Sequence, residues 1–171
     1  PAQLDLVEKG TRILESWGLR VRHPKDLIRP YHFHAQTDEK RFEFLYRALR
    51  APDSRAVWCV RGGYGACRLV PSLLKKVAPS RPKLFIGISD NTTLHFLLNQ
   101  KWKWTSLHGP IVERLGADTL PLEIVEETRQ MVFGEVAVAA YRDLQPLNAR
   151  AKAKKKVEGI LVGGNLTTMQ A

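Results

Sequence analysis

Cysteine is scarce in this chain, which contains only Cys59 and Cys67 among 171 residues. Two cysteines cannot form a disulfide framework, and the five histidines are too scattered to supply ligands to a metal. The sequence therefore predicts no metal, no cofactor and no need for an oxidising compartment. Cys59 lies in a strand-like run and is expected to be a small buried hydrophobic residue.

Long apolar runs are also lacking, and none approaches the roughly 20 residues that a membrane-spanning helix needs. The first residues have neither the basic nor the apolar region of a secretory signal. We therefore expect no membrane partner and a cytoplasmic location. The composition, 44% hydrophobic and 26% charged, is that of a globular domain large enough to bury a core.

Acidic residues are few relative to basic ones, 17 against 27, so the net charge is +10. Five of the basic residues lie between positions 150 and 156. Such a cluster can bind nucleic acid, but no aromatic residues are interleaved with it. A solvated basic loop is the preferred interpretation, and nucleic acid is not the expected partner. A non-catalytic basic module that binds anionic polymers stays open as an alternative.

Short apolar runs alternate with helical patterns, which predicts an α/β fold with a mostly parallel sheet flanked by helices. Ligands of such sheets bind beyond the carboxyl ends of the strands. Three predicted strands end in turns rich in glycine or in Ser-Asp, and these turns should gather at one edge. Helices are expected at 2–17, 37–49, 92–100 and 122–133, and strands at 19–21, 56–60, 84–88, 104–105, 136–141 and 157–162.

Ser89 stands where the strand at 84–88 gives way to a helix. This arrangement projects a hydroxyl from the sheet edge above the backbone N–H groups of the helix start. Gly87 fits the nucleophile-elbow pattern G-x-S-x-G, but Asn91 replaces its second glycine. These residues alone leave two interpretations open, a nucleophile and a simple helix cap.

The segment Arg61-Gly62-Gly63-Tyr64-Gly65 follows the strand at 56–60. Its glycines allow the backbone to approach a ligand closely and to turn N–H groups inward. The loop could supply an oxyanion hole or hold a phosphate, although it matches neither a P-loop nor a dinucleotide fingerprint. Tyr64 packs either on a substrate or against the next helix, and the spacing does not decide.

Several motifs in register resemble the LD-carboxypeptidase family of serine peptidases. That family includes muramoyltetrapeptide carboxypeptidases and microcin-immunity peptidases. The matching residues are Asp38 and Arg41, Arg61-Gly62-Gly63-Tyr64-Gly65, Lys83, Gly87-x-Ser89-Asp90-x-Thr92, His108-Gly109-Pro110 and Gly163-Gly164-Asn165-Leu166.

The resemblance implies that Ser89 is the nucleophile and that the backbone N–H groups of Asp90 and Gly63 form its oxyanion hole. The implied reaction hydrolyses the amide between L-Lys or meso-diaminopimelate and a terminal D-Ala in murein tetrapeptides, a step of peptidoglycan recycling. Arg61 is the candidate for the terminal carboxylate, and a structural brace for the loop is its equal alternative. The expected substrate-binding set is Arg61, Gly62, Tyr64, His108 and Asn165.

A serine nucleophile needs a base, and the family takes a Glu and a His from a later, smaller domain. Asp90 diverges from Ser89 in a tight turn and is expected to cap the next helix, while His95 is expected to be structural. The implied organisation is an N-terminal α/β domain at 1–145, followed at 146–171 by a basic linker and an incomplete C-terminal domain. The chain alone is therefore expected to be inactive. A homodimer is a further expectation, and a microcin-type immunity peptidase stays open.

Overall fold

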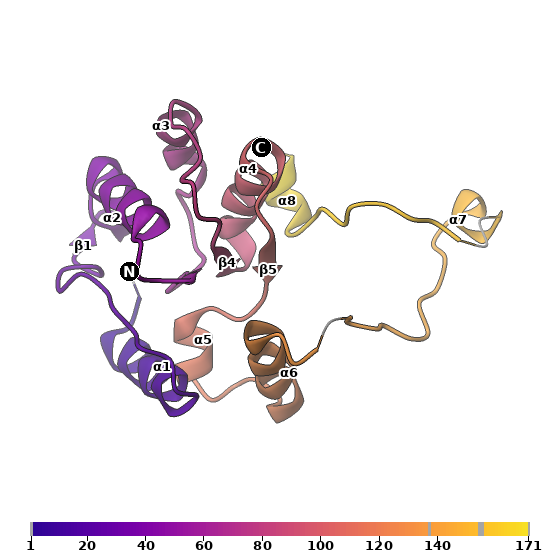
Figure 1. Cartoon of the computed structure of the whole chain (residues 1–171), viewed down its shortest axis with the longest axis horizontal. Coiled ribbons are helices and arrows are strands. Elements are labelled where there is room, and N and C mark those ends of the chain that lie inside the picture. Colours follow the sequence, from indigo (N-terminus) through magenta and orange to yellow (C-terminus); the bar gives the residue numbers. More distant parts are fainter. Residues whose placement is uncertain (1, 137, 154–155, 171) are drawn as a thin grey trace.

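The computed structural model describes residues 2–136, 138–153 and 156–170. Figure 1 shows a body of helices around a small sheet, from which the segment between residues 134 and 165 extends to one side. None of the helices in the described ranges is long and apolar enough to cross a membrane.

Helices make up most of the body (Figure 1). The short 3-10 helices are η1 (Cys67–Leu69) and η2 (Ser89–Asn91), and a small hairpin joins β1 (Pro30–Tyr31) to β2 (His34–Ala35). The α-helices are α1 (Leu4–Ser16), α2 (Asp38–Arg50), α3 (Val70–Leu74), α4 (Thr92–Trp102), α5 (Val112–Gly116), α6 (Leu122–Phe133), α7 (Ala149–Ala153) and α8 (Leu166–Met169).

The sheet has three parallel strands in the order β3 (Ala56–Trp58), β4 (Leu84–Gly87) and β5 (Ser106–His108). Each strand is followed by a helix, as in other α/β folds. The predicted α/β fold with a parallel sheet is therefore confirmed. Because the strands run the same way, the segments that follow β3, β4 and β5 leave from one edge of the sheet.

Hydrophobic side chains form two clusters on opposite faces of this sheet. Val57 packs with the cluster of Phe85 and Leu98, which α2, η1, α3 and α4 also line. The next residue, Trp58, packs with the cluster built on α1 and α5, because successive strand residues point to opposite faces. Phe85 and Ile86 of β4 are fully buried, so the central strand is covered on both sides.

The start of α2 follows the predicted capping pattern. Thr37 is extended, and its hydroxyl accepts a hydrogen bond from the Lys40 backbone N–H. At the other end of the helix, the buried Lys83 ammonium donates to the carbonyls of Ala48 and Ala51. These contacts fix α2 against the sheet, which matters below because α2 reaches the candidate site.

Some predicted strands are wrong. Residues 19–21 form no strand, and Leu19 and Val21 instead pack on the cluster of α1 and α5. The strand expected at 104–105 lies slightly later, at Ser106–His108. The described residues of 136–141 and the whole of 157–162 also lie outside any strand. They are mostly exposed and lie away from the sheet, so no neighbouring strand can pair with their backbones (Figure 1).

Candidate active site at the Ser89 turn

Ser89 lies in a sharp turn between β4 and α4. Its φ is +59°, a left-handed backbone that costs a residue with a side chain about 1–2 kcal/mol. Such strain persists only where the surrounding structure holds it, and it is common at catalytic sites. A β carbon at Gly87 would stand 3.0 Å from both the Cys59 sulfur and Asn91 Nδ2, so any larger residue before this turn would have to displace these side chains. The geometry is that of a nucleophile elbow.

The helix-cap alternative for Ser89 is not what the structure shows. A capping serine has an extended backbone, and its hydroxyl accepts a hydrogen bond from the first helical turn. Ser89 has a left-handed backbone, and neither η2 nor α4 has a side-chain cap. Asn91, which replaces the expected second glycine, donates from Nδ2 to the carbonyls of Arg61 and Ile88 at 3.1 and 3.0 Å. Asn91 therefore joins the Ser89 turn to the segment that follows β3.

That segment, Arg61–Gly65, is called the glycine loop here, and it lies directly against Ser89. A β carbon at Gly62 would be 3.1 Å from Ser89 Cβ and 3.6 Å from Ser89 Oγ. Gly63 and Gly65 have φ values of +106° and +108°, which suit glycine alone. The structure thus brings together two of the three turns that the sequence analysis expected at one edge of the sheet; the segment before the third turn, at 157–162, forms no strand.

Asp90 acts differently from the prediction. Its carboxylate does not cap its own helix, but accepts a hydrogen bond from the Ala66 backbone N–H at 2.8 Å. Ala66 is the first flanking residue of η1, so Asp90 caps the neighbouring 3-10 helix and joins it to the Ser89 turn. Burial raises the pKa of Asp90 above its usual range, although the Ala66 hydrogen bond and the charge of Arg41 act in the opposite direction.

Arg61 braces the glycine loop. Its Nη1 lies 3.0 and 3.1 Å from the two carboxylate oxygens of Glu113 in α5. Glu113 is nearly buried and also accepts a hydrogen bond from the Gln3 backbone N–H. Of the two roles predicted for Arg61, the structure shows the brace, and a contact with a substrate carboxylate stays a prediction. Nothing in the sequence spacing pointed to Glu113, which lies 52 positions from Arg61.

The histidines near this edge have different surroundings. His95 is buried, and its Nε2 lies 2.9 Å from the Gly87 carbonyl oxygen. Because a carbonyl can only accept, Nε2 carries the proton, and burial lowers the pKa of the ring so that it stays neutral. The structural role predicted for His95 is confirmed. His108 is exposed at the end of β5, beside Gly87, and its expected place in a cleft stays a prediction, as does substrate contact by the exposed Tyr64.

Asn165 lies beside the start of α4, near the Ser89 turn. Its backbone N–H donates to the Thr92 hydroxyl at 3.0 Å, and its side-chain oxygen caps α8 by accepting from the Thr168 N–H. A β carbon at Gly164 would be 2.5 Å from Thr92 Oγ1, so the Gly-Gly-Asn motif makes a close backbone contact with α4. A substrate contact by Asn165 stays a prediction.

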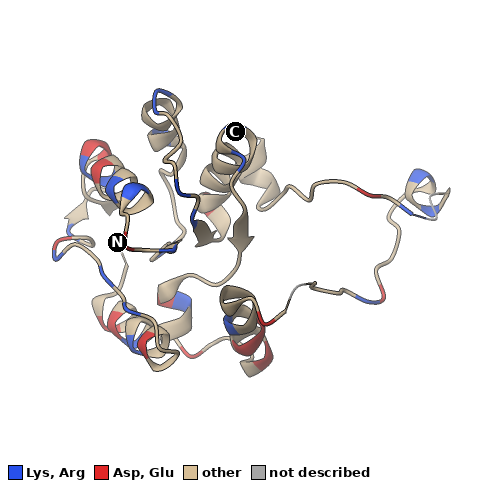
Figure 2. Cartoon of the chain, viewed as in Figure 1, with Lys and Arg blue, Asp and Glu red and all other residues tan. Residues whose placement is uncertain are grey.

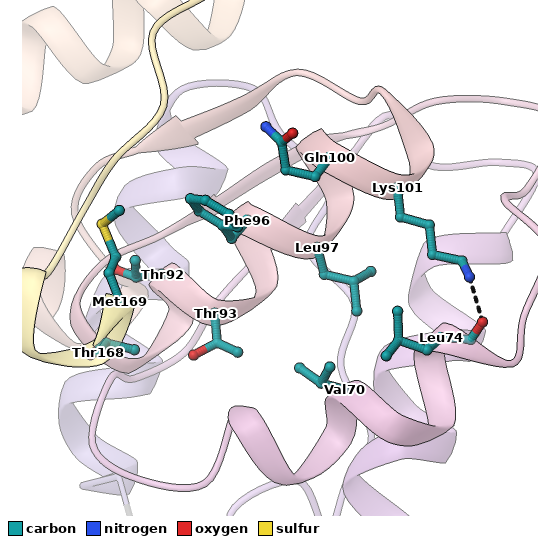
Figure 3. A pocket seen from close by; sticks show the side chains of 10 residues that line it. All are labelled: Val70, Leu74, Thr92, Thr93, Phe96, Leu97, Gln100, Lys101, Thr168 and Met169. Atoms are coloured by element: carbon teal, nitrogen blue, oxygen red, sulfur yellow. Dashed lines mark hydrogen bonds between the residues drawn. The ribbon is translucent and has the colours of Figure 1, made fainter. Parts of the chain in front are cut away.

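A cavity of about 310 Å³ lies along α4, between α3 and α8 (Figure 3). Its wall is mostly apolar, and Lys101 closes one end by donating to the Leu74 carbonyl at 2.6 Å. Ser89 is not among its lining residues. The lining residues are Val70, Leu74, Thr92, Thr93, Phe96, Leu97, Gln100, Lys101, Thr168 and Met169.

The described part of the chain contains no cluster of side chains that could bind a metal ion. No group of three or more His, Cys, Asp or Glu side chains there could hold a metal ion. Burial raises the pKa of the Cys59 thiol, which packs against the cluster of Phe85 and stays protonated.

The sequence pattern of the LD-carboxypeptidase N-terminal domain matches residues 1–109. The chain belongs to the LD-carboxypeptidase family. A candidate carboxypeptidase of Rickettsia prowazekii is 41% identical over 142 residues, which are 81% of this chain and 44% of that protein. A murein tetrapeptide carboxypeptidase of Pseudomonas aeruginosa is 33% identical over 168 residues, 96% of this chain and 54% of that protein. The chain therefore spans about half the length of these LD-carboxypeptidase relatives.

Solved structures show the same fold. A muramoyltetrapeptide carboxypeptidase from Oxalobacter formigenes has a TM-score of 0.63 at 26% identity, over 77% of this chain and 45% of that chain. The microcin C7 self-immunity protein MccF without ligand has a TM-score of 0.68 at 18% identity, over 97% of this chain and 57% of that chain. The second likeness is one of fold alone.

Proposed function

We propose that this chain carries the nucleophile of a serine LD-carboxypeptidase. Its substrate is a murein tetrapeptide, from which it removes the terminal D-alanine during cytoplasmic peptidoglycan recycling. The observation that carries the proposal is the left-handed Ser89 turn held against Gly62 of the glycine loop. The named activities of the Pseudomonas aeruginosa and Oxalobacter formigenes relatives support the choice of substrate.

The proposed reaction uses the serine and the backbone groups that the family resemblance implies. Ser89 Oγ loses its proton to a base and attacks the carbonyl carbon between the L-centre and D-alanine. The backbone N–H groups of Asp90 and Gly63 stabilise the oxyanion that forms. The C–N bond then breaks, D-alanine leaves after its amine receives a proton, and water hydrolyses the acyl-enzyme to restore Ser89.

The base is proposed to come from outside this chain. Among the described residues, no histidine or carboxylate is hydrogen-bonded to Ser89 Oγ, and His95 is already bonded to Gly87. The proposed source is the Glu and the His that the family resemblance implies in a later domain, after the predicted boundary at residue 145, and the relatives matched above are about twice as long as this chain. We expect the chain alone to be inactive or nearly so, and the complete enzyme to be a homodimer.

The test is release of D-alanine from a tetrapeptide that ends in L-Lys-D-Ala or meso-diaminopimelate-D-Ala. It compares the chain alone with the chain extended by the C-terminal part of the Pseudomonas aeruginosa relative, and uses that relative as the positive control. We expect release only from the extended chain, and none after Ser89→Ala. The matched control is Ser72→Ala, an exposed serine of α3, which should leave the rate unchanged.

Three outcomes contradict the proposal. A folded extended chain that releases no D-alanine, while the Pseudomonas aeruginosa protein does, excludes this substrate class. Cleavage of a peptidyl nucleotide in place of the tetrapeptide would identify a microcin-type immunity peptidase. Binding of an anionic polymer that survives Ser89→Ala, but is lost when Lys152, Lys154, Lys155 and Lys156 are neutralised, would favour the basic binding module.

A further inference from the structure

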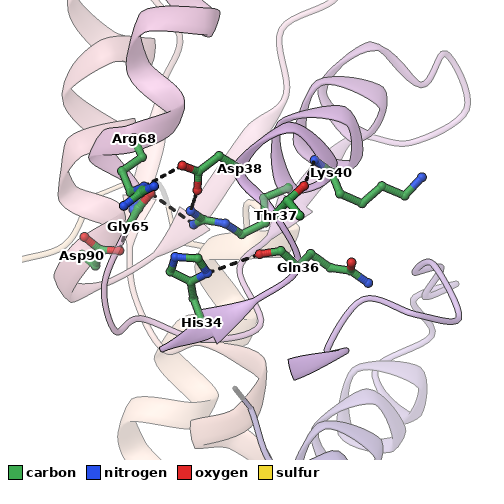
Figure 4. Close-up of polar contacts among 10 residues, drawn as sticks. His34, Gln36, Thr37, Asp38, Lys40, Gly65, Arg68 and Asp90 are labelled. Atoms are coloured by element: carbon green, nitrogen blue, oxygen red, sulfur yellow. Dashed lines mark hydrogen bonds and ion pairs between the residues drawn. The ribbon is translucent and has the colours of Figure 1, made fainter. Parts of the chain in front are cut away.

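One peptide unit of the molecule is bound at both ends by charged side chains. The Gly65 carbonyl accepts a hydrogen bond from Arg41 Nη1 at 3.1 Å, and the N–H of the following residue, Ala66, donates to Asp90 Oδ2 at 2.8 Å (Figure 4). Since the peptide is planar, these two bonds fix its orientation. The first comes from α2 and the second from the residue after Ser89.

Arg41 is itself held in place by a carboxylate. Its Nη2 pairs with one oxygen of Asp38, and the other oxygen accepts from Arg68 Nε at 2.6 Å (Figure 4). Although burial acts to raise the pKa of Asp38, the hydrogen bonds from Arg68 and Arg41 hold it below its usual range. Asp38 therefore stays ionised and joins the first turn of α2 to η1, on the far side of the glycine loop.

Arg41 lies in close contact with the backbone of the glycine loop. A β carbon at Gly65 would be 3.0 Å from both terminal nitrogens of Arg41. The guanidinium thus lies against the Gly65 backbone. With Asp38, Asp90, Arg41 and Arg68, the cluster has two negative and two positive groups, so its charges balance.

We propose that Arg41 and Asp38 are positioning residues, which hold the Gly65–Ala66 peptide and thereby keep the glycine loop in the conformation that aims the Gly63 N–H at the oxyanion formed at Ser89. The inference deepens the proposed function and rests on it for the role of that N–H group. The other end of the loop is braced by Arg61 and Glu113. Between the two braces lie only Gly62, Gly63 and Tyr64.

Glycines make this arrangement necessary. Gly62 and Gly63 restrict their backbones less than other residues, so without fixed ends their N–H groups could point in several directions. An oxyanion hole works only when its donors are aimed in advance at the charge that develops. Loss of the Arg41 contact should therefore slow the chemical step and leave substrate binding nearly unchanged.

The first experiment measures amide hydrogen exchange in the full chain by NMR and does not depend on catalysis. In Arg41→Gln and Asp38→Asn, we expect the Ala66 amide, which donates to Asp90, to exchange at least about tenfold faster, while the β4 amides keep their protection. The matched control is Arg22→Gln, which breaks a two-bond pair with Asp53 far from the loop and should change neither set. Uniformly faster exchange, or unchanged exchange at Ala66, would overturn the inference.

The second experiment measures D-alanine release by the extended chain. In Arg41→Gln, we expect kcat to fall about 10- to 100-fold while KM stays within about twofold of the wild-type value. Arg41→Lys should recover only part of the rate, because one ammonium group cannot bond both the Gly65 carbonyl and the Asp38 carboxylate as the guanidinium does. Arg22→Gln should match the wild type. A raised KM with unchanged kcat would contradict a positioning role. If the unmodified protein releases no D-alanine, the proposed function fails, and the exchange experiment still decides whether Arg41 holds the loop.

Discussion

Ser89 and Asp90 are neighbours whose side chains serve different parts of the fold. The Ser89 hydroxyl faces Gly62 of the glycine loop, whereas the Asp90 carboxylate turns to Ala66 beyond that loop. The sequence indicated that two polar residues ended a buried strand, but it could not show which backbone groups they would meet. Those partners lie 24 or more positions away, and they come close only because β3 and β4 are adjacent and parallel.

The backbone strain at Ser89 gives a direct prediction. Ser89→Gly and Ser89→Ala both remove the hydroxyl, but only alanine keeps a β carbon in the left-handed conformation. We expect Ser89→Gly to be more stable than Ser89→Ala by about 1 kcal/mol. Urea unfolding of the two variants measures this difference. Equal stabilities, or a more stable alanine variant, would show that the turn does not hold the φ found here.

The raised pKa of Asp90 predicts a pH dependence. Because burial disfavours its ionised form, the folded protein loses stability as the pH rises from the ordinary carboxyl value of 3.8 through the raised folded pKa. Asp90→Asn cannot titrate, so its stability relative to wild type should improve between about pH 4 and pH 7. Urea unfolding at several pH values tests this.

Asp53 provides a control of opposite sign for that titration. The hydrogen bonds from Arg22 lower the pKa of Asp53, so its carboxylate adds stability as the pH rises. Asp53→Asn should therefore lose stability relative to wild type only as the pH rises towards 3.8 from below, and by a small amount because the pair is exposed and screened by salt, so between about pH 4 and pH 7 it should show almost no trend. A common trend in the two variants would contradict the assignment to Asp90.

At the scale of elements, α1 and α5 cross at two glycines. The buried residues of α1, Val7, Gly10 and Leu14, are spaced as one helical face. A β carbon at Gly10 would be 2.1 Å from the Val112 carbonyl oxygen, and one at Gly116 would be 1.9 Å from the Leu6 carbonyl oxygen. The two backbones are therefore in contact, and neither position tolerates a side chain.

Because of this crossing, we expect Gly10→Ala to destabilise the protein, although alanine favours a helix more than glycine does. In an isolated helix, Gly10→Ala would add about 1 kcal/mol of stability. Here the added methyl group meets backbone atoms, so we expect the free energy of unfolding to fall by about 2 kcal/mol. Lys9→Ala, at an exposed neighbouring position, is the control and should change stability little. Thermal or urea unfolding decides, and a stabilised Gly10→Ala would mean that α1 does not pack on α5 as found.

The elements that the sequence predicted well are those with a buried face or a clear end signal. The helix at 122–133 has the predicted bounds, and α2 begins after Thr37. The apolar run that ends at Gly87 forms β4. The segments at 136–141 and 157–162 are as apolar as true strands, but a strand also needs a neighbour to receive its backbone hydrogen bonds. Local composition does not contain that information, and it could not have identified Glu113 as the partner of Arg61.

At the scale of the whole molecule, charge and exposure divide the chain. The ribbon in Figure 2 is mostly red at the charged positions of α6 and blue at those of α7, which lies apart from the body on the extended segment. The described residues from 138 to 163 are exposed almost throughout, and Leu147 and Leu161 are about as accessible as in an unfolded chain. The body from α1 to α6 contains both hydrophobic clusters, and none of the described residues from 138 to 163 belongs to either cluster.

This division predicts where a protease cuts first. Trypsin needs an accessible lysine or arginine in a backbone that can enter its active site, and exposed irregular segments satisfy both conditions. Arg142, Arg150 and Lys152 are exposed, whereas Lys83 is buried with its ammonium bonded to the end of α2. We expect brief digestion, followed by mass spectrometry, to find the first cuts after those three residues and an N-terminal fragment that still unfolds cooperatively. The fragment's end would place the domain boundary close to the predicted residue 145. Equally early cuts within α2 or α6 would show that the body does not fold independently of the extended segment.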